Sequence, residues 1–194
     1  MFAVIFEVKP TVGQYDGYLA LAALLRPEVE QIDGFIENRR YRSLRRPEWM
    51  VSVSFWRDEK ALIRWRTHAG HHLVQGKGRA GIFADYHLRV GEVFAGDGAG
   101  PVQSRLDETE TGVARAMSVI EGPEASAALV TPGLVGQERF DGITVPGSRL
   151  LLLHWSDRRA CAALGASGAG KRRDVRVIRD YTMTDRREAP QYFA

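Results

Sequence analysis

The chain has 194 residues, a formal net charge of +3, and 44% hydrophobic against 26% charged residues, a balance that excludes a disordered chain or a fibre. It contains no apolar run as long as a membrane span, and it opens with a strand-like segment in place of a secretory signal. Its one cysteine, Cys161, excludes an internal disulfide framework. We therefore expect a cytoplasmic protein without membrane contact, in which Cys161 packs in the core.

The first half of the chain alternates between strand and helix patterns. Its predicted strands are Phe2–Pro10, Gly34–Arg42, Trp49–Trp56 and Phe83–Phe94. Apolar residues at helical spacing follow Gly13, and Asp58 is placed to cap a second helix that carries Trp65. Gly70 weakens the case for a continuous helix beyond that point. The order is β-α-β-β-α-β, which is that of a ferredoxin-like unit.

Most of the excess positive charge lies at one predicted turn. The arginines that flank the turn Leu44–Pro47 are Arg39, Arg40, Arg42, Arg45 and Arg46. Such a patch attracts nucleic acid, but these arginines lack the interleaved aromatic residues of a base-stacking platform. We interpret the segment as a solvated hairpin and expect no nucleic-acid partner.

The second half repeats the same order with shortened parts. Its predicted strands are Val113–Ile120, Gly133–Asp141, Ser148–Trp155 and Asp174–Thr184. Only Pro123–Val130 is left for its first helix, and Asp157–Leu164 forms a short second one. Leu150–Leu153 shows no polar alternation, so both faces of that strand should be covered.

An internal duplication explains this order. The segment Gly34–Leu62 lies over Gly133–Cys161 without a gap, 99 positions further on. The identical pairs are Gly34 and Gly133, Arg40 and Arg139, Pro47 and Pro146, Trp56 and Trp155, Asp58 and Asp157, and Ala61 and Ala160. Because these identities fall at turns and strand ends, we infer that one supersecondary unit is used twice.

The duplication divides the chain into four parts. We predict a first unit over residues 1–95, a linker over 96–111, a second and trimmed unit over 112–185, and a C-terminal tail over 186–194. Units of this size bury little surface alone, so we expect the two copies to pack against each other. The C-terminal tail has room to lie across the first unit.

Several stretches of the first half resemble the antibiotic biosynthesis monooxygenase (ABM) domain family of the dimeric α/β-barrel superfamily. They are VIFEV, RPEVEQIDGFI, SFWRDEKALIRW and FADYHLRV, together with His71 and Gln75, and they cover nearly all of residues 1–95. Family members are usually single domains that dimerise and close a barrel from two four-stranded sheets. The resemblance thus implies an α+β fold in which two ferredoxin-like βαββαβ units of one chain form a pseudo-dimeric α/β barrel. It leaves room for a homodimer of the fused chain.

The same resemblance bears on function. The family includes oxygenases that use neither metal nor flavin, and haem-degrading enzymes marked by an Asn on the first strand and an axial His on the second helix. Phe6 and Gln75 occupy those two places here, which disfavours haem degradation. The resemblance therefore implies a monooxygenase, an oxidoreductase without cofactor, acting on a small aromatic or polyketide-like substrate in a pocket of the first unit. The alternative is a non-catalytic small-molecule-binding or stress-related protein of the same fold.

Oxygenation without a cofactor needs a base, hydrogen-bond donors and an apolar pocket. His71, at a place where the family commonly has a histidine, is the predicted base. Trp65 is predicted to form the pocket wall, with His68 and His72 on the same helix face if the helix continues. Asn38 and Tyr41 on the second strand can both donate hydrogen bonds, but their opposite parity means that at most one of them lines a single pocket. We predict Asn38 as the substrate-binding residue of the two.

The three histidines also raise the question of a metal site. His71 and His72 are adjacent, so on a helix their side chains point about 100° apart. No carboxylate accompanies them in a metalloprotease-like pattern. We therefore predict no metal ligands.

Overall fold

A computed structural model describes residues 1–100, 107–123, 130–165 and 170–190. The strands are β1 (Phe2–Pro10), β2 (Phe35–Ser43), β3 (Met50–Trp56), β4 (Phe83–Gly96), β5 (Ala116–Glu121), β6 (Leu134–Gly142), β7 (Arg149–Trp155) and β8 (Lys171–Thr182). The helices are α1 (Tyr15–Glu30), α2 (Glu59–Thr67), α3 (Ala69–Lys77) and α4 (Arg158–Ala163), and the π-helical turn η1 (Gly78–Ile82) precedes β4.

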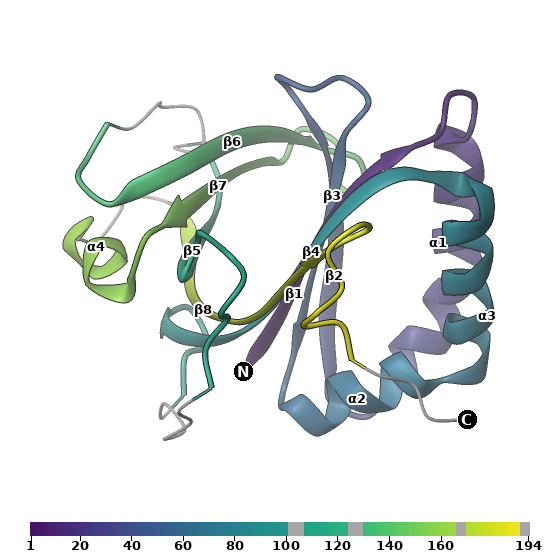
Figure 1. Cartoon of the computed structure of the whole chain (residues 1–194), viewed down its shortest axis with the longest axis horizontal. Coiled ribbons are helices and arrows are strands. Elements are labelled where there is room, and N and C mark those ends of the chain that lie inside the picture. The colour runs from purple at the N-terminus through teal and green to yellow at the C-terminus, as the bar shows by residue number, and fades with distance from the viewer. Residues whose placement is uncertain (101–106, 124–129, 166–169, 191–194) are drawn as a thin grey trace.

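These strands form one closed barrel in the order β1-β3-β2-β6-β7-β5-β8-β4. The first half contributes β4-β1-β3-β2 and the second half contributes the equivalent series β8-β5-β7-β6, so matching edge strands meet at two seams. Helices α1, α2 and α3 cover the first-half strands on one side of the molecule, and α4 lies on the opposite side (Figure 1). The predicted α+β fold of two ferredoxin-like units closing a pseudo-dimeric barrel is confirmed.

The boundaries of the elements differ from the prediction in a few places. β5 begins at Ala116 rather than Val113, and β8 begins at Lys171 rather than Asp174. The predicted end of the first unit at residue 95 falls one residue before the end of β4, and the predicted start of the second unit at residue 112 falls between β4 and β5. Most of the predicted helix Pro123–Val130 lies outside the described residues, as do residues 101–106 of the linker and 191–194 of the tail.

Apolar side chains fill the barrel and also cover its outer faces. From β7, Leu150 and Leu152 enter the core inside the barrel, whereas Leu151 and Leu153 pack with Trp155 and Cys161 of α4 on the outside. Both faces of this strand are covered, as its unbroken leucine run predicts. Burial raises the pKa of the Cys161 thiol to about 11, which confirms its place as a packed core residue. Within the described residues, no helix has the length and apolar character needed to cross a membrane.

The duplicated Gly, Asp and Ala residues build the same corner twice. Gly34 and Gly133 have φ angles of 91° and 79°, a region that favours glycine. Each glycine sits against the alanine of the following helix, and a Cβ added to Gly34 would lie 2.7 Å from the Cβ of Ala61. The Asp58 carboxylate accepts the Ala61 amide hydrogen at 2.8 Å, and Asp157 repeats this cap in the second half. The corner explains why these residue types recur.

Gly34→Ala is expected to lower the free energy of unfolding by about 2–3 kcal/mol, because it adds backbone strain and a steric overlap with Ala61. Chemical denaturation measures the change. Gly76→Ala is the matched control, since a Cβ there meets nothing within 4 Å and lies in α3. Equal stability of Gly34→Ala and wild type would contradict this account of the corner.

The arginine-rich hairpin is not simply solvated, and that interpretation is wrong for Arg39 and Arg46. Arg46 donates to the Glu7 carboxylate at 2.6 Å and pairs with Glu138, both of which are buried. Arg39 lies 3.2 Å from Glu121 across the barrel. Closure of the barrel brings these carboxylates to the hairpin from strands distant in the sequence, which the local pattern of arginines does not show.

Candidate functional site

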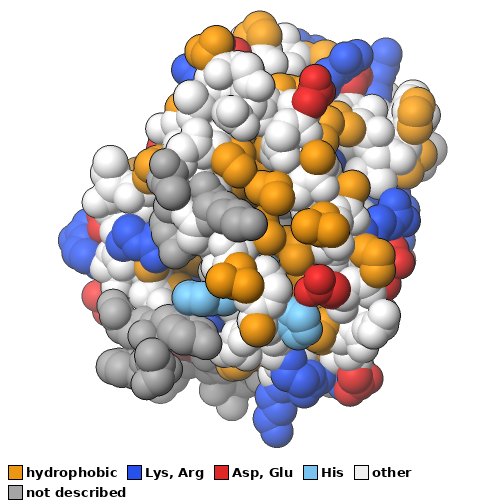
Figure 2. All heavy atoms as spheres, turned by 90° about the vertical axis from the view of Figure 1, so that its right-hand side faces the viewer, with side chains coloured by type: hydrophobic (Ala, Val, Ile, Leu, Met, Phe, Trp, Pro, Cys, Tyr) orange, Lys and Arg blue, Asp and Glu red, His pale blue; other side chains and the backbone are white. Residues whose placement is uncertain are grey.

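A cavity of about 940 Å³ lies between the outer face of the first-half strands and helices α1, α2 and α3. Its lining from the strands consists of Val4, Phe6, Phe35, Ile36, Glu37, Asn38, Arg40, Ser52, Ser54, Trp56, Phe83, Tyr86, Leu88 and Val90, with Arg179 and Tyr181 from β8. Figure 2 shows the helical face over the cavity, where hydrophobic side chains gather in the middle and charged ones lie toward the rim. The cavity combines apolar and aromatic side chains with many charged and polar ones, and its size is in the range of small-molecule sites.

A break between α2 and α3 positions the aromatic residues of this cavity. α2 ends at Thr67, and His68 adopts an extended backbone with φ −65° and ψ 130° before α3 begins. The break lets the His71 ring stack on Trp65, with centroids 4.4 Å apart and planes inclined by 16°. Both residues line the cavity, as predicted from the sequence.

The surroundings of His71 define its protonation. Its Nδ1 lies 3.1 Å from the carbonyl oxygen of Trp65, which can only accept, so Nδ1 carries the hydrogen. Nε2 is then the acceptor, 3.4 Å from the amide nitrogen of Gln75. Burial lowers the pKa of His71 to about 4. The ring is therefore neutral at physiological pH, and the Nε2 lone pair accepts one long hydrogen bond, from Gln75.

Of the other predicted site residues, two line the cavity and one does not. His72 lines the cavity, but His68 is not part of its lining and instead lies with Nδ1 3.3 Å from Glu28 of α1. Asn38 lines the cavity, but its Nδ2 donates to Ser52 Oγ at 2.8 Å and to the Val53 carbonyl at 3.2 Å. Its donors are used within the sheet, so Asn38 offers an acceptor rather than the predicted donor.

Sequence reasoning missed several residues of the lining. Arg40 shares the strand face of Asn38, two positions away, and this parity was a signal that could have identified it. Tyr86 and Tyr181 also border the cavity, and burial raises the pKa of Tyr181 to about 12. Thr144 reaches the cavity from the hairpin of the second half. Nothing in its local sequence indicates that position.

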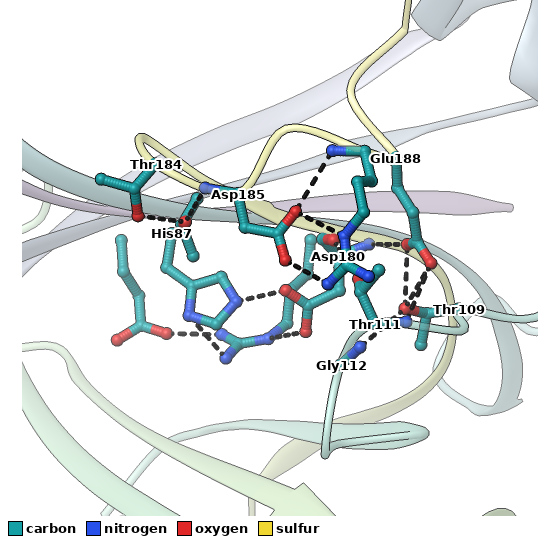
Figure 3. Close-up of polar contacts among 12 residues, drawn as sticks. His87, Thr109, Thr111, Gly112, Asp180, Thr184, Asp185 and Glu188 are labelled. Carbon is teal, nitrogen blue, oxygen red and sulfur yellow. Dashed lines mark hydrogen bonds and ion pairs between the residues drawn. The ribbon is translucent and has the colours of Figure 1, made fainter.

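The C-terminal tail forms part of the cavity wall through residues 186–190. Glu188 anchors it by accepting from the backbone amides of Glu110 and Asp180, both at 2.6 Å, and from the Thr109 hydroxyl at 2.8 Å. Figure 3 shows Glu188 directed toward Thr109 and Asp180. Arg186 donates to the Tyr86 hydroxyl. The described part of the tail therefore lies across the first half.

Behind the tail, buried ionic groups cross the barrel. Asp180 accepts from His87 and from Arg89 Nε at 3.1 Å, and Arg89 also donates to Glu7 at 2.7 Å. His154 lies near this cluster, and its Nε2 is buried with no partner among the described residues. Burial, followed by the positive charge of Arg89, lowers the pKa of His154 to about 4. This cluster was not predicted from the sequence.

Stability is expected to fall between pH 6.5 and 4, because the pKa values of His71 and His154 both drop from 6.5 to about 4 on folding. The unfolded chain then binds protons first, so each contribution is fully present above pH 6.5 and lost as the pH falls toward 4. Each histidine accounts for about 2 kcal/mol at about pH 5. Urea denaturation of His154→Gln at about pH 7 and 5 should show roughly half of the wild-type loss, and an unchanged loss would contradict the assignment.

The fold and cavity define a class: an α/β-barrel protein with a cavity between its sheet and its helices. A family model described as "Antibiotic biosynthesis monooxygenase" matches residues 1–77. A "Jasmonate monooxygenase ABM" of Pyricularia oryzae is 41% identical over 214 residues, covering 100% of this chain and 98% of that protein. The chain therefore belongs to the antibiotic biosynthesis monooxygenase family. This membership favours an oxidoreductase over the non-catalytic alternative.

Two solved structures are similar over part or most of the chain. A putative antibiotic biosynthesis monooxygenase from Deinococcus radiodurans is 14% identical with a TM-score of 0.45, covering 53% of this chain and 99% of that one. A putative monooxygenase from Lactobacillus acidophilus is 9% identical with a TM-score of 0.43, covering 94% and 96%.

Proposed function

We propose that the chain is a cofactor-independent monooxygenase whose substrate lies in the cavity of the first half. The observation that supports this proposal is His71: a neutral imidazole whose unprotonated Nε2 has only a long contact with Gln75, stacked on Trp65 in the wall of the cavity. A neutral base beside a cavity that excludes water is suited to removing a proton from a bound substrate, which leaves an electron-rich anion. Although a low pKa weakens the base, the imidazolium and the substrate anion would stabilise each other in a cavity of low polarity.

The reaction balances without an added reductant when the substrate has an acidic CH₂ group. His71 accepts one proton from that carbon, and the carbanion transfers one electron to O₂. The two radicals combine to a peroxide, whose loss of water leaves a carbonyl. Overall CH₂ and O₂ become C=O and H₂O, and the substrate itself supplies the electrons.

Two substrate classes follow from different observations. A histidine base favours the aromatic or polyketide-like compounds predicted from the sequence, since phenols and anthrones form stabilised anions. The relative named for jasmonate favours a small apolar acid. Thr144 brings the second half to the cavity, so we also propose that the fused pair is the functional unit.

Oxygen uptake by chelator-treated protein tests the proposal. The panel contains an anthrone, a dihydroquinone and jasmonate, each with and without an external two-electron reductant, because conversion of a C–H bond to an alcohol requires one. We expect uptake with at least one compound and one atom of ¹⁸O₂ in its product, with heat-denatured protein as the control. Uptake no faster than the buffer rate across the panel, or activity restored only by metal or flavin, would contradict the proposal.

A further inference from the structure

Among the described residues, the side chain of Arg40 is a cation without a hydrogen-bond acceptor or an ion-pair partner. Its side chain lines the cavity from β2, and its Nε is buried with no hydrogen-bond acceptor among the described residues. Its backbone is held firmly, since its amide donates to Thr144 Oγ1 at 2.9 Å and its carbonyl accepts from Ile143 at 2.8 Å. The side chain is therefore presented to the cavity from a rigid place on the sheet.

Three other arginines of the cavity wall differ from Arg40 because the chain supplies their acceptors. Arg26 pairs with Glu30 at 2.7 Å, Arg187 pairs with Asp185 at 2.5 Å, and Arg186 donates to the Tyr86 hydroxyl. A buried N–H group without an acceptor destabilises the protein, and more so when the group is charged. A buried, charged donor without an acceptor in the protein is therefore available to bind an acceptor on a ligand.

Three acidic residues of the wall are held by partners other than Arg40. Glu37 lies 2.7 Å from Arg173, Glu30 pairs with Arg26, and Glu188 is held by backbone amides. Arg66 and Arg179 also line the cavity, and neither forms an ion pair within the described part of the chain. The cavity thus presents an excess of positive charge to its contents.

Arg40 is repeated in the second half as Arg139, yet the two surroundings differ. Arg139 is exposed, whereas Arg40 lies beneath the helices of the first half. A packing role common to Arg40 and Arg139 therefore does not explain why Arg40 is covered by the helices. A planar guanidinium with free N–H groups matches a carboxylate, which accepts two parallel hydrogen bonds.

We propose that Arg40 determines substrate specificity by binding the carboxylate of an organic acid whose apolar body occupies the rest of the cavity. The inference rests on the proposed function and deepens it, since it names the charged group of the substrate. Phe6 of β1 and Leu88 of β4, which line the cavity from the sheet as Arg40 does, supply apolar surface for the rest of the substrate. The acid is anionic at neutral pH and meets a cation whose side chain has no competing partner in the part of the chain that the structure describes.

Binding of acids and their methyl esters tests the proposal on the intact chain. The probes are jasmonate, 1-naphthoate and 2-naphthaleneacetate with their esters, titrated by calorimetry. Wild type should bind at least one acid about 10- to 100-fold more tightly than its ester, the range for hydrogen bonds to a charged group. In Arg40→Gln the ratio should fall to near one while the affinity for the ester is unchanged.

Arg42→Gln is the matched control, because Arg42 lies two positions further along the same strand but is exposed and outside the cavity lining. It should keep the wild-type ratio. No binding of any acid, equal binding of acid and ester by wild type, or a ratio that survives in Arg40→Gln would each overturn the proposal. Thermal unfolding of the unliganded variant is measured alongside, and a midpoint well below wild type would assign Arg40 a structural role instead.

The outcomes also separate this inference from the proposed function. Oxygen uptake with a neutral anthrone that is unchanged in Arg40→Gln, together with equal binding of acid and ester, would overturn the carboxylate anchor and leave the oxygenase standing. Selective binding of an acid that depends on Arg40 but is followed by no oxygen uptake would support the anchor and count against the oxygenase.

Discussion

His71→Ala is expected to lower the rate of oxygen uptake by about 100- to 10,000-fold, the usual contribution of a positioned general base. The Nε2 of His71 is the acceptor left by the contact of Nδ1 with the Trp65 carbonyl. His68 also stacks on Trp65, with ring centroids 5.6 Å apart, but it is not part of the cavity lining. The rate is measured with a substrate identified in the panel above, at saturating concentration, after circular dichroism shows that the variant is folded.

His72→Ala is the control for this result, since His72 is the adjacent histidine, also lines the cavity, and is not part of the stack on Trp65. Its effect should stay within about tenfold. Trp65→Phe should change binding more than the maximal rate, because it keeps an aromatic wall. Equal losses in His71→Ala and His72→Ala, or none in either, would show that His71 is not the base.

The pH profile provides a second measurement on the same residue. Because burial lowers the pKa of His71 to about 4, the imidazole is in its accepting form throughout the neutral range. Activity should therefore stay level as the pH falls through 6.5, the ordinary histidine pKa, and drop only near 4. A drop centred on 6.5 would point to a different, more exposed base.

Glu7→Ala is expected to lower the free energy of unfolding by about 3–5 kcal/mol, the cost of breaking a buried ion pair by removing one partner. Glu7 is 4% exposed, and its two oxygens accept from Arg89 at 2.7 Å and Arg46 at 2.6 Å. Burial acts to raise its pKa, but the charges around it, Arg89 first, lower it to about 2. Removing the carboxylate leaves two guanidinium groups without this acceptor.

Glu48→Ala is the matched comparison, because Glu48 forms an exposed pair with Lys9 at 2.9 Å. It should cost less than about 1 kcal/mol. Equilibrium denaturation in urea at neutral pH measures both. Similar values for the two variants would mean that the ionic cluster inside the barrel contributes no more than a surface pair does.

The sequence was sufficient to predict the architecture because its signals for the fold are local and repeated. Gly34 and Asp58 recur in the second half, where Gly133 and Asp157 make the same corner and the same helix cap. The parity of β2 also separated Asn38 on the cavity side from Tyr41, which is buried in the barrel core. Periodicity and turn chemistry are sufficient for such conclusions.

The ionic cluster and much of the cavity wall could not be predicted, because they depend on contacts between distant segments. The sequence shows Arg46 beside a turn but not the Glu7 carboxylate that the barrel brings to it. The backbone change at His68 directs that side chain toward Glu28 instead of the cavity, and only the packing of α1 reveals this. The tail lies against Tyr86 through a contact that spans 100 positions.

The seam between β2 and β6 has a consequence for symmetry. Arg42 pairs in register with Asp141, which is its own counterpart in the repeat, and Tyr41 and Ser43 pair with Gly142 and Phe140 on either side. An approximate two-fold axis therefore passes through the Arg42–Asp141 position. In a dimer of identical chains the residue on that axis meets a copy of itself, so any charge there faces a like charge. A single polypeptide escapes that restriction and can place an arginine opposite an aspartate.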